Sequence, residues 1–283
     1  MKTLIRNSVF IFGTVLTSLF ASCSKNETAP DYKELQNLPK DTGGIHSAVV
    51  YNSSVNPYGY YLYTPSGYEK NDAVYPLLVF LHGSGEKGNS MTDANVLKKV
   101  LANGPPKLIN AKKWGPKYPM IVVSPQCHDS GWNPAKIHKL IAMIVQNYRI
   151  NTGRIYLTGL SMGGYGTYSY VEAYADTGYV AAVVPVCGGG NTSKAKSYKN
   201  MPLWAFHGDA DLTVLVSQSI NMVNAINALS PVVKAKLTIY PGVAHDSWTR
   251  TYDSSGMGTE KADYDPFNLT IYDWMFTFKK NLK

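Results

Sequence analysis

A serine flanked by glycines, in the segment Gly159-Leu160-Ser161-Met162-Gly163, is the pattern in this chain that most directly indicates chemistry. The segment follows an apolar run at 155–158 and precedes a stretch at 164–175 that we expect to be helical. A sharp strand-to-helix turn crowds the backbone, and the two glycines remove the β-carbons that would clash there. Such a turn raises the serine hydroxyl above the sheet, next to a helix N-terminus that favours developing negative charge. We therefore predict that Ser161 is a nucleophile.

A serine hydroxyl needs a base to remove its proton, and that base is usually a histidine oriented by a carboxylate. His245 follows the last predicted strand, in a loop that can hold an imidazole over the sheet. Two carboxylates, Asp209 and Asp211, follow the preceding strand. The residues thus predict a triad of Ser161, His245 and one of these two aspartates.

Four stretches resemble the α/β-hydrolase superfamily: LHGSGEKG (81–88), GLSMGGYGT (159–167), HGDADLTV (207–214) and PGVAHDSW (241–248). The order serine, acid, histidine along the chain is also the order in that superfamily. Within it, the chain is similar to lid-less carboxylesterases and carbohydrate (feruloyl or acetyl) esterases. It also resembles predicted peptidases related to phospholipase/carboxylesterase. The resemblance covers the chain from about Tyr60 to its end.

The resemblance implies which aspartate is the acid. In the family pattern H-G-x-x-D-x-x-V the carboxylate falls on Asp211, and Val214 completes the match. This favours Asp211 over Asp209. Asp246 is adjacent to His245 in the sequence and is expected to point elsewhere.

The tetrahedral intermediate carries an oxyanion, which needs preorganised N–H donors. The residue after the nucleophile, Met162, supplies one donor, and the loop after the first parallel strand supplies the second. In the resembling esterases the residue after H-G has this role, here Ser84, with Gly85 as the near alternative. His82 and His207 each begin an H-G turn, and we interpret both as structural anchors.

The elements that must position these residues are indicated by hydrophobic patterning. Short apolar runs bounded by glycine or proline are typical of strands buried on both faces. Two tyrosine-rich stretches within 44–63 predict an antiparallel start, and helical spacing of apolar residues predicts the helices. The predicted strands cover 75–82, 120–124, 155–158, 180–187, 203–207 and 236–240, and the predicted helices cover 137–148, 164–175, 216–229 and 268–279. The alternation predicts an α/β fold, a mostly parallel central sheet flanked by helices, with the site at the carboxyl ends of the strands.

The segment 187–201 is too short for the helical lid that many α/β-hydrolases insert, so we expect no large lid domain. An open site suits bulky or polymer-attached substrates. Trp132, Tyr165 and Trp248 lie in or next to the site loops, where their rings either stack on sugars and phenolic acyl groups or pack the loops. Gln126 is a further candidate for lining the pocket.

These residues predict a serine hydrolase that cleaves carboxylic esters on carbohydrate or aromatic substrates through an acyl-enzyme intermediate. A serine peptidase of the same fold is one alternative, because fold and triad are shared. A non-catalytic carbohydrate-binding protein on a hydrolase scaffold is the other. We expect no cofactor and no metal, since H-E-x-x-H and C-x-x-C are absent from the sequence and the glycines at 163, 164 and 166 lack the full G-x-G-x-x-G frame.

Composition excludes other classes of protein. Hydrophobic residues make up 45% of the 283 residues and charged residues 16%, which excludes a disordered chain. The net charge is +8, but the lysines are scattered, so we expect no nucleic-acid partner. The sequence leaves open whether Cys127 and Cys187 form a disulfide. The sheet order of the resembling family disfavours it, because it separates their strands by roughly 14 Å. We expect a monomer.

Residues 1–22 read as a secretory signal, with Lys2 and Arg6 before an apolar run too short to span a bilayer. The small residues before Cys23 resemble a bacterial lipobox, although Phe20 departs from its usual leucine. We expect lipidation of Cys23 and export to a membrane, periplasmic or cell-surface, with an ordinary signal peptide as the alternative. Residues 23–44 then form a polar tether, and 45–283 form the catalytic domain.

Overall fold

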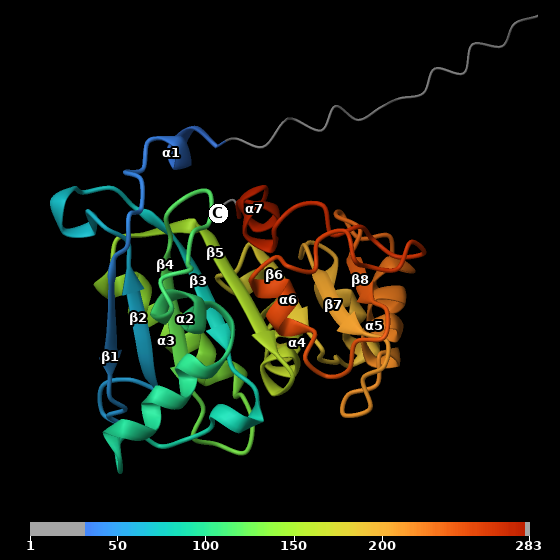
Figure 1. The fold of residues 1–283 in the computed structure, drawn as a ribbon, viewed down its shortest axis with the longest axis horizontal. Coiled ribbons are helices and arrows are strands. Elements are labelled where there is room, and N and C mark those ends of the chain that lie inside the picture. Colours follow the sequence, from blue (N-terminus) through green and yellow to red (C-terminus); the bar gives the residue numbers. More distant parts are fainter. Residues whose placement is uncertain (1–31, 281–283) are drawn as a thin grey trace, which may run out of the picture. The chain divides into compact units, whose positions relative to one another are not determined.

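The computed structural model describes residues 32–280, so the predicted signal peptide and Cys23 lie outside the described residues (Figure 1). The described part contains an eight-stranded sheet: β1 (Ile45–Val49), β2 (Gly59–Thr64), β3 (Tyr75–Leu81), β4 (Ile121–Gln126), β5 (Ile150–Leu160), β6 (Ala182–Val186), β7 (Trp204–Gly208) and β8 (Lys236–Tyr240). Its α-helices are α1 (Lys33–Gln36), α2 (Gly104–Asn110), α3 (Pro134–Asn147), α4 (Met162–Tyr174), α5 (Ser217–Asn227), α6 (Trp248–Tyr252) and α7 (Ile271–Phe276).

The sheet is mostly parallel. Its strands lie in the order β1-β2-β4-β3-β5-β6-β7-β8, and β2 runs antiparallel to both of its neighbours. The pairs from β4 onward are parallel. The predicted antiparallel start and parallel continuation are therefore confirmed. Because parallel strands end at the same edge of a sheet, the loops after β3, β5, β7 and β8 meet there.

Helices cover both faces of the sheet, which confirms the predicted α/β architecture (Figure 1). Leu77 and Val79 of β3 pack in one core with α3, α4 and α5, whereas Leu78 and Phe80 pack in a second core with α2, α6 and α7. Successive side chains of a strand point to opposite faces. Every residue of β3 is buried, and this is why the strand has a continuous apolar sequence.

Several element boundaries differ from the predicted ones. β5 begins at Ile150, α4 begins at Met162, and the terminal helix covers only the six residues of α7. No hydrophobic pattern between 83 and 119 predicts an element, whereas the structure has α2 and a 3-10 helix at Ala94–Ala102 there. Two prolines in the first turn of α2 make that stretch resemble a loop, although proline is tolerated at the start of a helix.

The folded unit begins before Ile45, so the predicted tether is too long. Leu35 of α1 is only 1% exposed. Glu34 pairs with Arg154 at 2.6 Å and with Lys279 at 2.8 Å. Arg154 is itself buried, and a buried guanidinium needs a carboxylate partner. Residues from α1 onward thus pack on the domain whose predicted start is residue 45.

Cys127 and Cys187 are both buried free thiols. They follow β4 and β6, which are separated by β3 and β5 in the sheet, and they form no disulfide with each other. Between residues 32 and 280, the structure has no helix that is both long and apolar enough to span a bilayer.

Candidate active site

Ser161 lies on the tight turn between β5 and α4, with φ 52° and ψ −116°. Such a backbone conformation is strained for a residue other than glycine, and strained residues cluster at functional sites. The Ser161 N–H donates to the Val186 carbonyl at 3.0 Å, which fixes the turn to β6. A β-carbon on Gly163 would overlap the Leu81 carbonyl oxygen, and one on Gly159 would overlap the Gly163 carbonyl. The two predicted glycines are therefore required by the close approach of β3, β5 and α4.

The structure brings Ser161, His245 and Asp211 together, although up to 84 residues separate the bonded partners. The His245 Nε2 atom is 2.9 Å from the Ser161 Oγ, and its Nδ1 atom is 2.7 Å from the Asp211 Oδ2. The His245 side chain is 22% exposed, whereas that of Asp211 is fully buried. Solvent and substrate can thus reach the serine–histidine pair, while the Asp211 carboxylate is shielded from solvent.

The Asp211 carboxylate is held from several sides. Its Oδ1 accepts the N–H groups of Thr213 at 2.8 Å and Val214 at 2.9 Å. Burial acts to raise the pKa of Asp211, but hydrogen bonds from His245 and from these two N–H groups outweigh burial and leave the pKa lowered. Asp211 therefore stays ionised beside His245.

The neighbouring histidine and the rival carboxylates have other partners. His207 is fully buried, bonds to the Val214 carbonyl and the Ser219 hydroxyl, and so anchors the loop. Asp209 accepts the Gly242 N–H at 2.7 Å and pairs with Lys261. Asp246 accepts the Thr249 N–H, in the first turn of α6, at 3.0 Å. Of the three aspartates, Asp211 is the one hydrogen-bonded to the His245 ring.

The loop after β3 lies against the turn that carries Ser161. A β-carbon on Gly83 would be 3.7 Å from that of Ser161. The exposed Ser84 and Gly85 follow in the 3-10 turn Ser84–Glu86, and Met162 begins α4 directly after Ser161. The candidate oxyanion-hole residues thus border Ser161 on two sides. That their N–H groups donate to an oxyanion stays a prediction.

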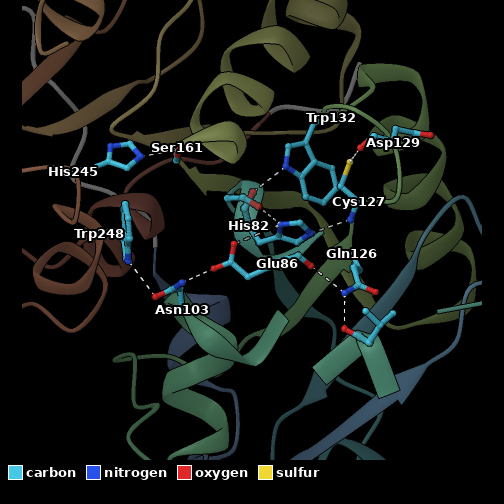
Figure 2. Close-up of polar contacts among 12 residues, drawn as sticks. His82, Glu86, Asn103, Gln126, Cys127, Asp129, Trp132, Ser161, His245 and Trp248 are labelled. Atoms are coloured by element: carbon cyan, nitrogen blue, oxygen red, sulfur yellow. Dashed lines mark hydrogen bonds and ion pairs between the residues drawn. The ribbon is translucent and has the colours of Figure 1, made fainter. Parts of the chain in front are cut away.

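His82 anchors this loop and is fully buried (Figure 2). Its Nε2 accepts the Cys127 N–H at 2.9 Å, so Nδ1 carries the proton and donates to the Gly83 carbonyl at 2.6 Å. Burial lowers the pKa of His82 to about 4, which keeps the ring neutral. The ring is therefore built into the loop.

The predicted substrate-binding side chains divide into two groups. Tyr165 is 41% exposed and lines a cavity of about 420 Å³ together with Met162, the residue that follows Ser161 in the chain. Trp132 borders the same cavity but is only 8% exposed, and its indole N–H donates to the His82 carbonyl at 3.0 Å. Tyr165 thus faces the cavity, while Trp132 mainly supports the loop.

Gln126 and Trp248 have structural partners as well. Gln126 is buried behind the loop, where its Nε2 donates to the Glu86 carbonyl at 3.0 Å and the Val96 carbonyl at 2.7 Å. Gln126 therefore supports the loop and does not line the cavity that Tyr165 and Met162 border. The Trp248 ring stands edge-on to His245, with ring centroids 5.2 Å apart.

One group of potential metal ligands among the described residues, Cys187, Asp211 and His245, has its ligand atoms within 4.8 Å of one another. Two members belong to the triad and bond to each other. Burial raises the pKa of the Cys187 thiol to about 12, so the thiol is protonated beside the triad. We interpret the group as the buried side of the triad.

Two polar residues at the site were not predicted: Glu86 and Asn103. Glu86 is 5% exposed, although a carboxylate in a glycine-rich loop would ordinarily face solvent. It lies within the motif LHGSGEKG, where its position next to the loop glycines was the available signal. Asn103 lies between two helices in a region without a recognisable pattern, and no sequence signal indicated it.

Comparison with known sequences gives two matches. The sequence model of the family described as phospholipase/carboxylesterase matches residues 67–254. A bifunctional acetylxylan esterase/xylanase from Neocallimastix patriciarum is 27% identical over 185 residues, which are 65% of this chain. The matched region is only 23% of that relative's length.

Solved structures give similar folds. A thermostable esterase superposes with a TM-score of 0.61 at 27% identity, covering 83% of this chain and 63% of the other. A feruloyl esterase module from Clostridium thermocellum, complexed with sinapinate, superposes with a TM-score of 0.60 at 18% identity, covering 88% and 92%. The second likeness is one of fold.

Proposed function

Because this chain belongs to the phospholipase/carboxylesterase family and has the α/β-hydrolase fold, we propose that it is a serine esterase. The observation that carries the proposal is the hydrogen-bonded chain from the Ser161 Oγ through His245 to Asp211. Both distances lie within the range that proton transfer in a triad requires. Met162, the residue after Ser161, lines a cavity open to solvent.

The geometry gives each residue a step in ester cleavage. His245 Nε2 takes the proton of Ser161 as its Oγ attacks the ester carbonyl, and Asp211 stabilises the imidazolium that forms. The oxyanion is stabilised by N–H groups of Met162 and Ser84. His245 then returns the proton to the departing alcohol, and a water molecule activated by the same ring hydrolyses the acyl-enzyme.

We propose esters on carbohydrate or aromatic groups as the substrate class. The support is the activity named for the relative, an acetylxylan esterase/xylanase, and the exposed Tyr165 ring in the cavity that Met162 also lines. The segment between β6 and β7 packs on the helix layer, where the buried Tyr198 hydroxyl donates to the Tyr168 carbonyl at 2.9 Å. The His245 side chain is 22% exposed, so we expect bulky alcohol groups to have access to the triad.

The test is a hydrolysis panel of acetyl, butyryl and feruloyl esters, long-chain triglyceride and peptide anilides with the purified protein. We expect short-chain or aromatic acyl esters to be cleaved faster than triglyceride, because little apolar surface is available to hold a long chain. Ser161→Ala should abolish both turnover and labelling by a fluorophosphonate probe. The exposed Ser255→Ala serves as the matched control and should retain both.

Two results of that panel would replace the proposal. Faster cleavage of peptide anilides than of all esters would favour the peptidase alternative. No Ser161-dependent turnover on any substrate would favour a non-catalytic role.

Export and lipid anchoring through Cys23 are a separate proposal, which rests on the sequence of residues 1–23. Cells that express the full chain should incorporate labelled palmitate into the protein, and Cys23→Ala should remove the label. Equal labelling of the two proteins would contradict lipidation at this residue.

A further inference from the structure

Asn103 occupies the position before α2 where an asparagine usually caps the helix, yet its side chain makes no capping hydrogen bond. A cap satisfies the backbone N–H of the second or third helical residue. Those residues are Pro105 and Pro106, which have no N–H to offer. The side chain of Asn103 is therefore free for contacts outside its own helix.

Both ends of the Asn103 amide bind residues of the active-site loops (Figure 2). Its Oδ1 accepts the indole N–H of Trp248 at 3.1 Å, and its Nδ2 donates to the Glu86 Oε1. An indole can only donate, and an ionised carboxylate can only accept. The amide between them therefore has one orientation that satisfies both partners.

Glu86 connects this amide to the loop after β3, which carries the candidate oxyanion donor Ser84 and is called the oxyanion loop below. Its Oε2 lies 3.9 Å from the buried His82 Nδ1, and its backbone carbonyl accepts the Gln126 side chain. A β-carbon on Gly83 would be 3.3 Å from the same Oε2 atom. The carboxylate thus lies directly beneath the turn that carries Ser84.

Trp248 connects the amide to the catalytic base. Its ring stands at 89° to the His245 ring, with centroids 5.2 Å apart. An edge-to-face contact of this kind restrains both rings. The chain of contacts from Glu86 through Asn103 to Trp248 therefore joins the oxyanion loop to His245, which belong to opposite ends of the domain sequence.

We infer that Asn103 is a positioning residue, which sets the distance between the oxyanion loop and His245 through its bonds to Glu86 and Trp248. The inference rests on the proposed esterase function. Its physical basis is that catalysis requires donors and base in fixed geometry, and a displacement of about 1 Å can reduce the rate roughly 100-fold. We refer to Glu86, Asn103 and Trp248 below as the positioning chain.

The test is a double-mutant cycle on a short acetyl ester. Asn103→Ala removes the amide, and Trp248→Phe keeps a ring beside His245 but removes its N–H. We expect each change to lower kcat about 10-fold or more with little change in KM, since neither group need touch a small substrate. The double variant should be no slower than the slower single variant, because both changes break the same bond.

Matched variants separate positioning from stability. Glu86→Gln keeps an oxygen that can accept from Asn103 and should retain most of kcat, whereas Glu86→Ala should not. Asn227→Ala removes two amide hydrogen bonds to Ala235, far along the sheet, and should lower the melting temperature while leaving kcat unchanged.

Three outcomes would overturn the inference: multiplicative losses in the double variant, an unchanged kcat in both single variants, or a loss confined to KM on aryl esters. The last would make Trp248 a substrate contact instead. The rate of Ser161 labelling by a fluorophosphonate is measured on every variant as well. If the wild type cleaves no ester, the proposed function fails, and this labelling rate still tests the positioning chain.

Discussion

At the scale of single residues, the hydrogen bonds around each aspartate explain which one orients His245. Asp211 is buried and accepts two backbone N–H groups on one oxygen, which leaves the other directed at the imidazole. Asp209 bonds to Gly242 and Lys261 near the surface. The loop geometry after β7 thus separates the two carboxylates, although they are two positions apart in the sequence.

Asp211→Asn should keep the fold and sharply reduce turnover. The amide cannot stabilise the imidazolium and favours the wrong tautomer of His245; the same change in a serine protease reduces kcat by about 10⁴. Asp209→Asn is the control, and its kcat should stay within about tenfold of wild type. Steady-state kinetics on the acetyl ester measures both. A larger loss in Asp209→Asn would contradict the assignment of the acid.

The same substitution should alter the pH dependence of stability. Because the pKa of Asp211 is lowered in the folded protein, its carboxylate stabilises the fold above the unfolded pKa of about 3.9. This contribution is lost as the pH falls through the folded pKa. Urea unfolding at pH 7 and near pH 3 should therefore show a larger loss for wild type than for Asp211→Asn. Equal losses would show that the carboxylate gains nothing on folding.

At the scale of elements, the turn that carries Ser161 depends on close contact between three backbones. Gly163 lies where α4 meets the end of β3, and Gly164 lies against β6, where a β-carbon would be 2.7 Å from the Val186 carbonyl. Backbone atoms cannot move aside as a flexible side chain can. The turn therefore tolerates no added carbon without a shift of the helix.

Gly163→Ala should destabilise the protein at the upper end of the about 1–3 kcal/mol that overpacking costs, or beyond it. Gly115→Ala is the matched control, because a β-carbon there meets no atom within 4 Å, and its effect should stay within about 0.5 kcal/mol. Chemical denaturation of the two variants measures the difference. Similar midpoints would mean that α4 shifts at little cost.

At the scale of the whole domain, the N-terminal segment closes the structure at the edge opposite the triad. Arg154 of β5 donates to Glu34 of α1 and to the Phe276 carbonyl of α7 at 2.7 Å. One buried guanidinium thus holds together the first helix, the central sheet and the last helix. This arrangement requires that residues before β1 belong to the folded domain.

Two truncated proteins test this boundary. A chain that begins at residue 45 loses the burial of Leu35, which for a core leucine contributes about 2–5 kcal/mol, and leaves Arg154 without its carboxylate. A chain that begins at residue 31 keeps both contacts. Thermal unfolding should show a lower melting temperature for the shorter chain, and equal melting temperatures would place the boundary at residue 45 after all.

Features governed by local backbone requirements could be predicted from the sequence. The serine turn was indicated by its two glycines, because the positions that must lack a β-carbon lie within two residues of the serine in the sequence. The strands β3 to β8 were indicated by apolar runs, because a strand buried on both faces needs apolar side chains throughout. The mostly parallel sheet followed from their alternation with helices.

Other features depend on contacts between distant segments, and only the tertiary structure decided them. The family motif already favoured Asp211 as the acid, but no sequence signal indicated the bond from Trp248 to Asn103, which joins residues 145 apart. Gln126 proved to support the oxyanion loop, and the supposed tether proved to pair with Arg154. Which polar groups meet is set by how the packed layers bring distant loops together, and a buried group must then find its partner there.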